Sequence, residues 1–589
     1  MSDGKEDAIE LLRELAELAT LDEGDPQSFR VRAYESARHG IEGHAGDLRK
    51  LSLAELQKIS GVGKSTASKL RELFDTGRVD KLDSLRKKHP ASVVALMRIP
   101  GLGPKAIARL RAELGIASVD DLKKAIGEHK LQELRGFGKK SEEKLSAVLA
   151  RLAKDGADRR TPISVALPVA EKILAELRAV PGVHRAEFCG SLRRFSETVG
   201  DLDIVVATDA PSALMERLVA LPVFDHVLVR GDKKTSAVTR RGLQVDVRAV
   251  KLSEIGAALL YFTGSKGHNI KLRQRALDRG MTLNEYALAE VDGGRVVACE
   301  TEEDIYRALD LPWIAPVLRE DAGEIELAER GALPALIPAS AMIGDFHVHT
   351  DLSGDGRSTL EEMVGAARAR GYKVLAITEH AEGLAMQGVK RDALTEQRAR
   401  IRAMQAELGD TLRLLHGVEL NIGPAGELDY DPAFRASFDF CLASVHDHFD
   451  LDEAKQTRRI VTAMEDPTVD MIGHLSARMI GGRPPIDLDV AAVLEAASRT
   501  GTALEINGAL PRLDVSADVI RRARGSDVTF VITSDAHHTS ELGRMDNGRA
   551  LAHKAWLSEE RTANAWPVER FLGWLERRRA RPSGSVALS

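Results

Sequence analysis

Residues 186–206 read AEFCGSLRRFSETVGDLDIVV and contain two apolar runs separated by a polar turn. Apolar residues dominate 186–189 and 202–207, which indicates two strands. Residues two apart on a strand face the same side, so Asp201 and Asp203 present a pair of carboxylates where the second strand begins. The stretch therefore predicts a sheet edge that carries closely spaced negative charge.

A third carboxylate follows downstream, because residues 243–250 form another predicted strand that contains Asp246. Three converging carboxylates repel one another unless cations lie between them. Two Mg²⁺ or Mn²⁺ ions held in this way can activate a hydroxyl and stabilise a leaving pyrophosphate. An Asp-x-Asp pair alone is commonly structural or solvated, but the Gly190-Ser191 turn upstream and Asp246 downstream together indicate nucleotidyl transfer.

Potential metal ligands recur at the ends of apolar runs between residues 345 and 537. Six runs end in such residues, which are His347 and His349, His380, Glu419, His446, His474, and Asp535 with His537. Apolar runs alternate here with helical patterns, a rhythm typical of a parallel sheet or barrel whose strand ends surround one mouth. One such histidine is commonly a core or surface residue, but six strand ends together make coincidence improbable and predict a metal site. Mixed imidazole and carboxylate ligands suit Mn²⁺, Zn²⁺ or Fe²⁺ better than Mg²⁺.

Short amphipathic helices separated by glycine turns are predicted over residues 1–155. Three turns share the pattern apolar-x-Gly-apolar-Gly and contain Gly61 and Gly63, Gly101 and Gly103, and Gly136 and Gly138. Such a turn lets backbone N–H groups approach a phosphate, and Lys64, Lys69 and Lys105 add positive charge. A single copy fits a helix-connecting turn equally well, but three copies favour binding to the DNA backbone.

Charge and composition restrict the classes of protein that fit. The 589-residue chain has a net charge of −6, so a basic surface must be local. Residues 50–88 hold ten Lys or Arg against five Asp or Glu, a local net charge of +5. The three cysteines lie far apart, which argues against a disulfide framework and against a Cys-based zinc site. We find no signal peptide or membrane span in the sequence and expect a cytoplasmic protein.

The residues around the three carboxylates resemble the family X DNA polymerases in order and spacing. The resemblance implies that Asp201, Asp203 and Asp246 hold two metal ions and catalyse nucleotide addition. It assigns the triphosphate to Gly190, Ser191 and Arg194, and it assigns the nucleotide pocket to Tyr261, Phe262, Gly264 and Asn269. Lys266 and Gln244 depart from the animal repair relatives, which carry Asp and Arg at these positions, so base-pair checking and pocket closure are expected to differ.

Residues 1–80 resemble the small end-binding domain of these polymerases. Lys69 matches the position of a lysine that forms a Schiff base with an abasic sugar in some relatives. That chemistry requires a lysine whose pKa is lowered. A plain phosphate contact is the role that we favour for Lys69.

The strand-end ligands resemble those of the polymerase-and-histidinol-phosphatase (PHP) domain, a metal-dependent phosphoesterase appended to bacterial family X polymerases. Nine positions match its metal set, namely His347, His349, Asp355, His380, Glu419, His446, His474, Asp535 and His537. Gly354 lengthens the loop before Asp355 by one residue, which leaves Asp351 as the nearby alternative. We expect His416 and His448 not to be ligands, and we expect Arg478 and Arg483 to contact phosphate.

These patterns predict a multidomain chain. The fold class is an α-helical helix–hairpin–helix region, an α+β nucleotidyltransferase palm and a distorted α/β barrel of the (β/α)₇ type. The expected domains are 1–80, 81–155, 156–255, 256–318 (the nucleotide-binding subdomain) and 341–575, with a linker at 319–340 and a tail at 576–589.

The resemblances cover residues 5–575 and imply a bacterial DNA polymerase that fills short gaps in DNA repair and carries a PHP 3′→5′ exonuclease. Related PHP domains also cut at abasic sites or remove 3′ phosphates. The expected partners are gapped or primer-template DNA and dNTPs, with the chain acting as a nucleoid-associated monomer. Two alternatives remain open: a DNA-end-binding scaffold with silent sites, and an RNA or small-molecule nucleotidyltransferase fused to a phosphatase.

Overall fold

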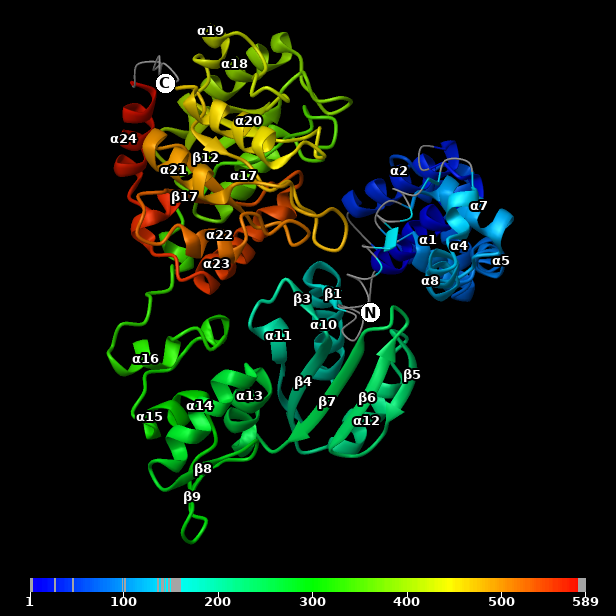
Figure 1. The fold of residues 1–589 in the computed structure, drawn as a ribbon, viewed down its shortest axis with the longest axis vertical. Helices are drawn as coiled ribbons and strands as arrows, with labels where there is room; N and C mark the ends of the chain where they lie inside the picture. The colour runs from blue at the N-terminus through cyan, green and yellow to red at the C-terminus, as the bar shows by residue number, and fades with distance from the viewer. Residues whose placement is uncertain are drawn as a thin grey trace. The chain divides into compact units, whose positions relative to one another are not determined.

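The computed structural model describes residues 4–25, 28–44, 47–97, 99, 102–134, 137–138, 142, 145–146, 149 and 160–580. The chain divides into two compact units, residues 1–159 and residues 160–589 (Figure 1). None of the helices in the described ranges is long and apolar enough to cross a membrane.

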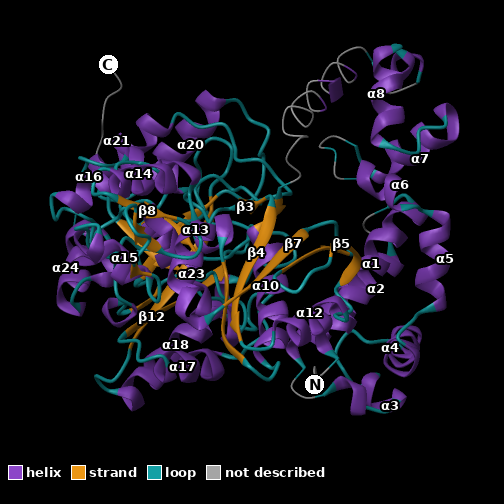
Figure 2. Cartoon of the chain, turned by 90° about the horizontal axis from the view of Figure 1, so that it is seen from below, coloured by secondary structure: helices purple, strands orange, loops and turns teal. Residues whose placement is uncertain are grey.

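The described part of the amino-terminal unit is built from helices alone (Figure 2). The α-helices are α1 Lys5–Glu23, α2 Phe29–Gly43, α3 Leu53–Leu56, α4 Lys64–Thr76, α5 Asp80–Lys88, α6 Ala91–Leu96, α7 Pro104–Leu114 and α8 Val119–Gly127. Helices α1 to α5 bury their apolar faces in one core, and helices α6 to α8 contribute to a second core. The predicted helical region is thereby confirmed and contains two packed groups of helices.

The second unit begins with a five-stranded mixed sheet, the palm, in the order β2-β4-β7-β6-β5. Its strands are β2 Val183–Phe188, β4 Asp201–Thr208, β5 Phe224–Val229, β6 Lys234–Thr239 and β7 Gln244–Val250. Helices α10 Ile163–Arg178 and α12 Pro211–Val219 contribute their apolar faces to the same core as the sheet. Strands β2, β4 and β7 were expected from their apolar runs, whereas the sequence of β6, KTSAVT, is too polar to stand out.

The next subdomain, the thumb, combines helices α13 Ile255–Thr263, α14 Lys266–Leu277 and α15 Glu302–Ala308 with a small antiparallel sheet. The sheet has the order β10-β9-β8 and consists of β8 Met281–Leu283, β9 Leu288–Glu290 and β10 Val296–Ala298. Helix α16, Glu324–Glu329, buries Ile325 and Ala328 in the thumb core. The first half of the expected linker at 319–340 therefore packs into the thumb.

The remaining strands form a seven-stranded sheet in chain order, with every neighbouring pair parallel. The strands are β11 Gly344–Asp345, β12 Val374–His380, β13 Arg413–Asn421, β14 Phe440–Ser444, β15 Met471–Ile472, β16 Ala503–Asn507 and β17 Phe530–Thr533. A parallel bridge between Val348 and Ala536 joins the first and last strands and nearly closes the barrel. The predicted barrel is confirmed, and its strand ends come together at one mouth.

Helices surround this barrel, and one of them closes its interior. They are α17 Leu360–Ala369, α18 Arg391–Leu408, α19 Pro432–Arg435, α20 Glu453–Glu465, α21 Val490–Thr500, α22 Ala517–Arg522, α23 Met545–Lys554 and α24 Val568–Arg579. The ring of Phe571 on α24 lies 4.3 Å from the ring of Phe346, inside the barrel core. The expected tail at 576–589 starts too early, because Arg578 is buried and Arg579 pairs with Asp470 at 2.6 Å.

A buried ion network joins the palm to the thumb. Glu302 accepts two hydrogen bonds from Arg193, at 2.8 and 2.9 Å, and one from Arg319 at 2.7 Å. Although burial opposes its ionisation, Arg319 and Arg193 lower the pKa of Glu302 to about 2. Arg319 lies within the expected linker and is fully buried, so this network anchors the first half of the linker.

We predict that Glu302→Ala destabilises the protein by about 3–5 kcal/mol, because it leaves two guanidinium groups buried without their anion. Urea unfolding at pH 7 measures the loss. Because the pKa of Glu302 is depressed, its stabilisation is present above the pKa of an unfolded glutamate and is lost as the pH falls toward 2. The matched control is Glu303→Ala, at the exposed neighbouring position, and an equal effect of the two substitutions would contradict the network's role.

Candidate functional sites in the palm and the barrel

Two parallel strands bring the palm carboxylates together. Asp203 on β4 lies directly opposite Asp246 on β7, and Asp201 lies opposite Gln244. Burial, followed by the charges of Asp201 and Asp246, raises the pKa of Asp203 to about 7. The repulsion that raises this pKa is relieved when cations lie among the carboxylates, so these residues fit a divalent metal site.

Lys234 on β6 completes the charge arrangement of the palm, although no sequence pattern singles it out. Its Nζ lies 2.9 Å from Oδ2 of Asp246, and Nε2 of Gln244 donates to Oδ1 at 3.0 Å. Although burial opposes ionisation, Lys234 and Gln244 hold the pKa of Asp246 below its usual value. Gln244, which stands where animal relatives carry Arg, therefore contacts the third carboxylate directly.

Gly190 lets the following turn approach the carboxylates closely. Its φ is +61°, and a Cβ at this position would lie 3.0 Å from Oδ2 of Asp203. The short helix α11, Gly190–Arg193, begins here and carries Ser191. Arg194 follows it and donates from Nη1 to the carbonyl of Thr263 at 2.6 Å and from Nε to Glu320 at 3.2 Å.

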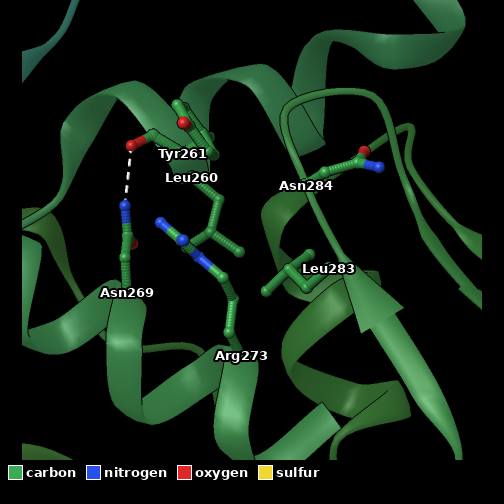
Figure 3. Close-up of a pocket in the computed structure, with 6 residues that line it drawn as sticks. All are labelled: Leu260, Tyr261, Asn269, Arg273, Leu283 and Asn284. Carbon is green, nitrogen blue, oxygen red and sulfur yellow. Dashed lines mark hydrogen bonds between the residues drawn. The ribbon is translucent and has the colours of Figure 1, made fainter. Parts of the chain in front are cut away.

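A small pocket in the thumb is lined by Leu260, Tyr261, Asn269, Arg273, Leu283 and Asn284 (Figure 3). The amide of Asn269 donates to the carbonyl of Tyr261 at 2.7 Å, and the guanidinium of Arg273 lies 5.4 Å from the Tyr261 ring centroid. The ring of Phe262 packs edge-on against Tyr261 at 5.0 Å, with Arg248 4.4 Å from its centroid. Arg273 is absent from the expected set, yet its place four residues after Asn269 puts it on the same helix face.

The first glycine turn of the amino-terminal unit is shaped by close packing. Gly61 has a φ of +74°, and a Cβ there would lie 2.4 Å from the carbonyl oxygen of Ser36. Gly63 and Gly103 are the N-caps of α4 and α7, which begin at Lys64 and Pro104, and Lys105 is the second residue of α7. The expected Gly101 and Gly136 lie outside the described residues.

Lys69 lies on α4, within the first hairpin. Its Nζ donates to Ser65 Oγ at 2.7 Å and lies 5.8 Å from the centroid of the Tyr34 ring. Burial, together with the charge of Lys81, lowers the pKa of Lys69. This is the direction of shift that Schiff-base chemistry favours.

All nine expected PHP residues lie in one network at the mouth of the barrel. Glu419, the only carboxylate on β13, is the centre of this cluster, and its carboxylate oxygens lie within 3.6 Å of ring nitrogens of His347, His349, His380, His446 and His474. Asp535 Oδ1 lies 3.5 Å from His347 Nε2 and 3.8 Å from His537 Nδ1. The described residues contain three overlapping groups of three ligands, and within each group the ligand atoms lie within 4.8 Å of one another.

Several buried ring nitrogens and one carboxylate oxygen of this cluster make no hydrogen bond, and this observation fits metal ions. Among the described residues, Nε2 of His347, both ring nitrogens of His349 and Oε2 of Glu419 have no hydrogen bond. Burial and the neighbouring His380 and His537 lower the pKa of His349 well below its usual value. Neutral imidazoles and carboxylates are the donors that Mn²⁺, Zn²⁺ and Fe²⁺ accept.

Asp351 and Asp355 both lie at exposed positions, and of the two it is Asp355 that lies within 3.5 Å of cluster histidines. Oδ2 of Asp355 is 3.4 Å from Nε2 of His380 and 3.5 Å from Nε2 of His537. Gly354 packs closely against the loop at Met386, where a Cβ would lie 2.4 Å from a carbonyl oxygen. The close approach that Gly354 allows fits a loop from which Asp355, with its side chain 41% exposed, reaches both histidines.

Several polar residues around the ligands are absent from the expected set. Oε1 of Glu505 lies 2.6 Å from Nδ1 of His347, and Oδ1 of Asn421 lies 2.7 Å from Nδ1 of His446. Asn507 donates to Asp535 at 3.1 Å, and Arg512 lies 3.4 Å from the same carboxylate oxygen. Glu505 and Asn507 lie at the end of the apolar strand β16. A polar residue at the end of an apolar run is the same signal that marked the ligands on the other strands.

The two expected phosphate contacts and the two expected non-ligands lie apart from the network. Arg478 is held by Glu197 of the palm at 2.8 and 3.0 Å, and Arg483 lies over the ring of Phe449 at 3.8 Å. His416 stacks on Phe438 and accepts from Arg398 at 3.2 Å, while His448 is exposed beside Asp447.

Comparison with known proteins agrees with this architecture. Two family models match the amino-terminal unit, Helix-hairpin-helix domain over residues 3–79 and SAM-like Helix-hairpin-helix tandem over residues 93–151. DNA polymerase beta thumb matches residues 258–320, and PHP domain matches residues 345–509.

Relatives match both halves of the chain. The chain is 30% identical to a "Probable phosphatase" of Shewanella sediminis over 40% of its own length and 94% of the relative, and 28% identical to "DNA polymerase lambda" of Rattus norvegicus over 46% of its length and 49% of the relative. It is 37% identical to "DNA polymerase/3'-5' exonuclease PolX" of Bacillus subtilis (strain 168), over 97% of its length and 99% of the relative. Because this match runs nearly end to end, with the thumb and PHP models in their expected places, the chain belongs to the bacterial PolX family, in which a family X DNA polymerase is joined to a PHP domain.

Proposed function

We propose that the protein fills short gaps in DNA during repair and degrades 3′ ends at its PHP cluster. As a member of the PolX family, the chain is a DNA polymerase and 3′→5′ exonuclease that uses DNA, dNTPs and divalent metal ions. The observation that carries the proposal is the direct pairing of Asp203 with Asp246 beside Gly190, in one subdomain, while the histidine cluster lies in another.

In the palm, we assign two Mg²⁺ or Mn²⁺ ions to Asp201, Asp203 and Asp246. When bound, these ions supply the charge that activates the primer hydroxyl and stabilises the leaving pyrophosphate. Lys234 keeps Asp246 ionised through its contact at 2.9 Å. The other proposed roles are triphosphate binding by Gly190, Ser191 and Arg194, and contact with the incoming nucleotide by Tyr261, Phe262, Gly264, Asn269 and Arg273.

In the barrel, we assign up to three Mn²⁺, Zn²⁺ or Fe²⁺ ions to the nine clustered residues. When bound, they supply an activated water for hydrolysis of the terminal phosphodiester. Glu505 and Asn421 hold the rings of His347 and His446 in orientation through their second nitrogens. Arg512 is better placed than Arg478 to contact a substrate phosphate, because Arg478 is paired with Glu197.

The same cluster supports a second activity on simpler phosphoesters. A relative that the PHP half matches over 94% of its length is named a probable phosphatase. We therefore propose that the barrel also removes 3′ phosphates or cuts at abasic sites. A 3′-phosphorylated primer that stays intact while an unmodified primer is degraded would contradict the phosphatase activity.

The amino-terminal unit is proposed to hold DNA ends through its hairpins, in domains at 1–80 and 81–155. The palm is assigned to 156–255, and the thumb extends from 256 through α16, which leaves residues 331–340 as the connection to the barrel. Lys69 is assigned a phosphate contact. Borohydride trapping of a covalent complex with an abasic site would replace that role with Schiff-base chemistry.

The two activities should separate by mutation. Asp203→Ala is expected to lower nucleotide addition on gapped DNA at least about a thousandfold, because several kcal/mol of transition-state stabilisation depend on the carboxylate. Its 3′→5′ degradation should persist. The double substitution His347→Ala and His349→Ala should abolish 3′→5′ degradation and leave nucleotide addition intact. Primer extension and degradation assays on one gapped substrate measure both, and loss of both activities in either variant contradicts two independent sites.

The loop that carries Asp355 gives a finer test of the barrel cluster. Asp355→Ala should reduce degradation about 10- to 100-fold with Mn²⁺, since the carboxylate contacts both His380 and His537. Asp351→Ala, four residues away on the exposed surface, is the matched control and should leave the rate unchanged. If Asp351→Ala is the damaging variant instead, Gly354 is not an insertion.

The amino-terminal hairpins should contribute affinity that depends on salt and little on sequence, because they contact phosphate groups. Deletion of residues 1–80 is expected to flatten the salt dependence of DNA binding and to remove any preference for gapped over open primer-template. Fluorescence anisotropy across a range of KCl concentrations measures the first effect and gap-filling rates measure the second. A preference that survives the deletion assigns gap recognition to another part of the chain.

A further inference from the structure

A lysine of the barrel contacts the arginine assigned to the triphosphate. Lys554 is the last residue of α23, and its Nζ donates to Oε1 of Glu320 at 2.5 Å and to the backbone carbonyl of Arg194 at 2.9 Å. The Lys554 side chain is only 13% exposed. Its two partners belong to the thumb connection and to the palm, so three parts of the unit meet at this lysine.

Glu320 is shared between two cations. The oxygen that accepts from Lys554 also accepts from Nε of Arg194 at 3.2 Å. A second donor of Arg194, Nη1, is taken by the carbonyl of Thr263 at 2.6 Å. The position of the Arg194 guanidinium thus depends on how strongly Glu320 attracts it, and Lys554 competes for the same carboxylate oxygen.

The contact rests on a packed interface between the barrel and the thumb. Trp556, two residues after Lys554, packs against the thumb core. On the same helix, Arg549 and His553 both hydrogen-bond to the carbonyl of Ile337, at 3.2 and 3.1 Å. Lys554 is therefore held in place by apolar and polar contacts on both sides along the chain.

We propose that Lys554 is a positioning residue for nucleotide addition, although it belongs to the PHP domain. By sharing Glu320 with Arg194, it leaves the guanidinium available to the triphosphate of a dNTP. This inference rests on the proposed role of Arg194 in triphosphate binding.

The charges give the proposal a definite sign. Arg194, Glu320 and Lys554 together carry a net charge of +1. Loss of Lys554 brings this to zero and leaves Glu320 to Arg194 alone, which weakens attraction for an anionic triphosphate. Loss of the Glu320 charge brings it to +2, and loss of both returns it to +1. A lysine with a purely structural role would not produce dNTP affinities that follow the net charge of the variants.

Single-turnover insertion into a one-nucleotide gap, followed over a range of dNTP concentrations with the full-length chain, tests the proposal. Lys554→Met is expected to raise the apparent Kd for dNTP about three- to tenfold, with the maximal rate unchanged within about twofold. Lys554→Arg should stay near wild type. Lys554→Met combined with Glu320→Gln should return the apparent Kd most of the way to the wild-type value. Glu320→Gln alone should lower the apparent Kd below the wild-type value.

The matched control is Lys373→Met, at an exposed position before β12 in the same domain, which should leave the apparent Kd unchanged. If the wild type extends primers and Lys554→Met binds dNTP with the same affinity, the inference is overturned and the proposed function stays intact. Absence of Asp203-dependent extension in the wild type overturns both. A double variant that is worse than Lys554→Met alone also overturns the inference, because it indicates structural damage.

Discussion

Metal-binding types of side chain converge at strand ends in two places, carboxylates in the palm and imidazoles with carboxylates in the barrel, and this convergence is the constraint on which the rest of the structure depends. In the palm, parallel pairing of β4 and β7 sets Asp203 opposite Asp246, and the cost appears as a raised pKa of Asp203. In the barrel, seven parallel strands direct imidazoles and carboxylates to one mouth, where Glu419 touches five histidines. Both sites are thus prepared for divalent ions before any substrate binds.

The two catalytic parts are also physically connected. The buried network of Arg193, Glu302 and Arg319 joins the palm to the thumb, and Arg478 of the barrel holds Glu197 of the palm. Lys554 adds a contact to the segment that begins at Gly190. These contacts join the barrel to the polymerase half, while the candidate metal ligands of the barrel and the palm carboxylates lie in different subdomains.

Local patterns in the sequence were sufficient for most of the architecture. The alternation at Asp201 and Asp203 and the strand-end histidines predicted the strands and the barrel, because both signals depend on periods of a few residues. Lys234 and Arg512 escaped notice, since each acquires its meaning from a carboxylate on another element, Asp246 and Asp535. For the same reason the sequence did not reveal that Arg319, within the expected linker, pairs with Glu302, or that Arg478 pairs with Glu197.

We propose that the ring nitrogens and carboxylate oxygens clustered around Glu419 are metal ligands. Bound-metal analysis of the full-length chain, after growth with ample manganese and zinc and removal of loose ions, tests this assignment without relying on activity. We expect about two to three transition-metal ions per wild-type chain, and loss of most of them in a folded Glu419→Gln variant, since Glu419 lies at the centre of the cluster. A folded wild-type chain that contains no transition metal, or a Glu419→Gln variant that retains the full complement, would contradict it.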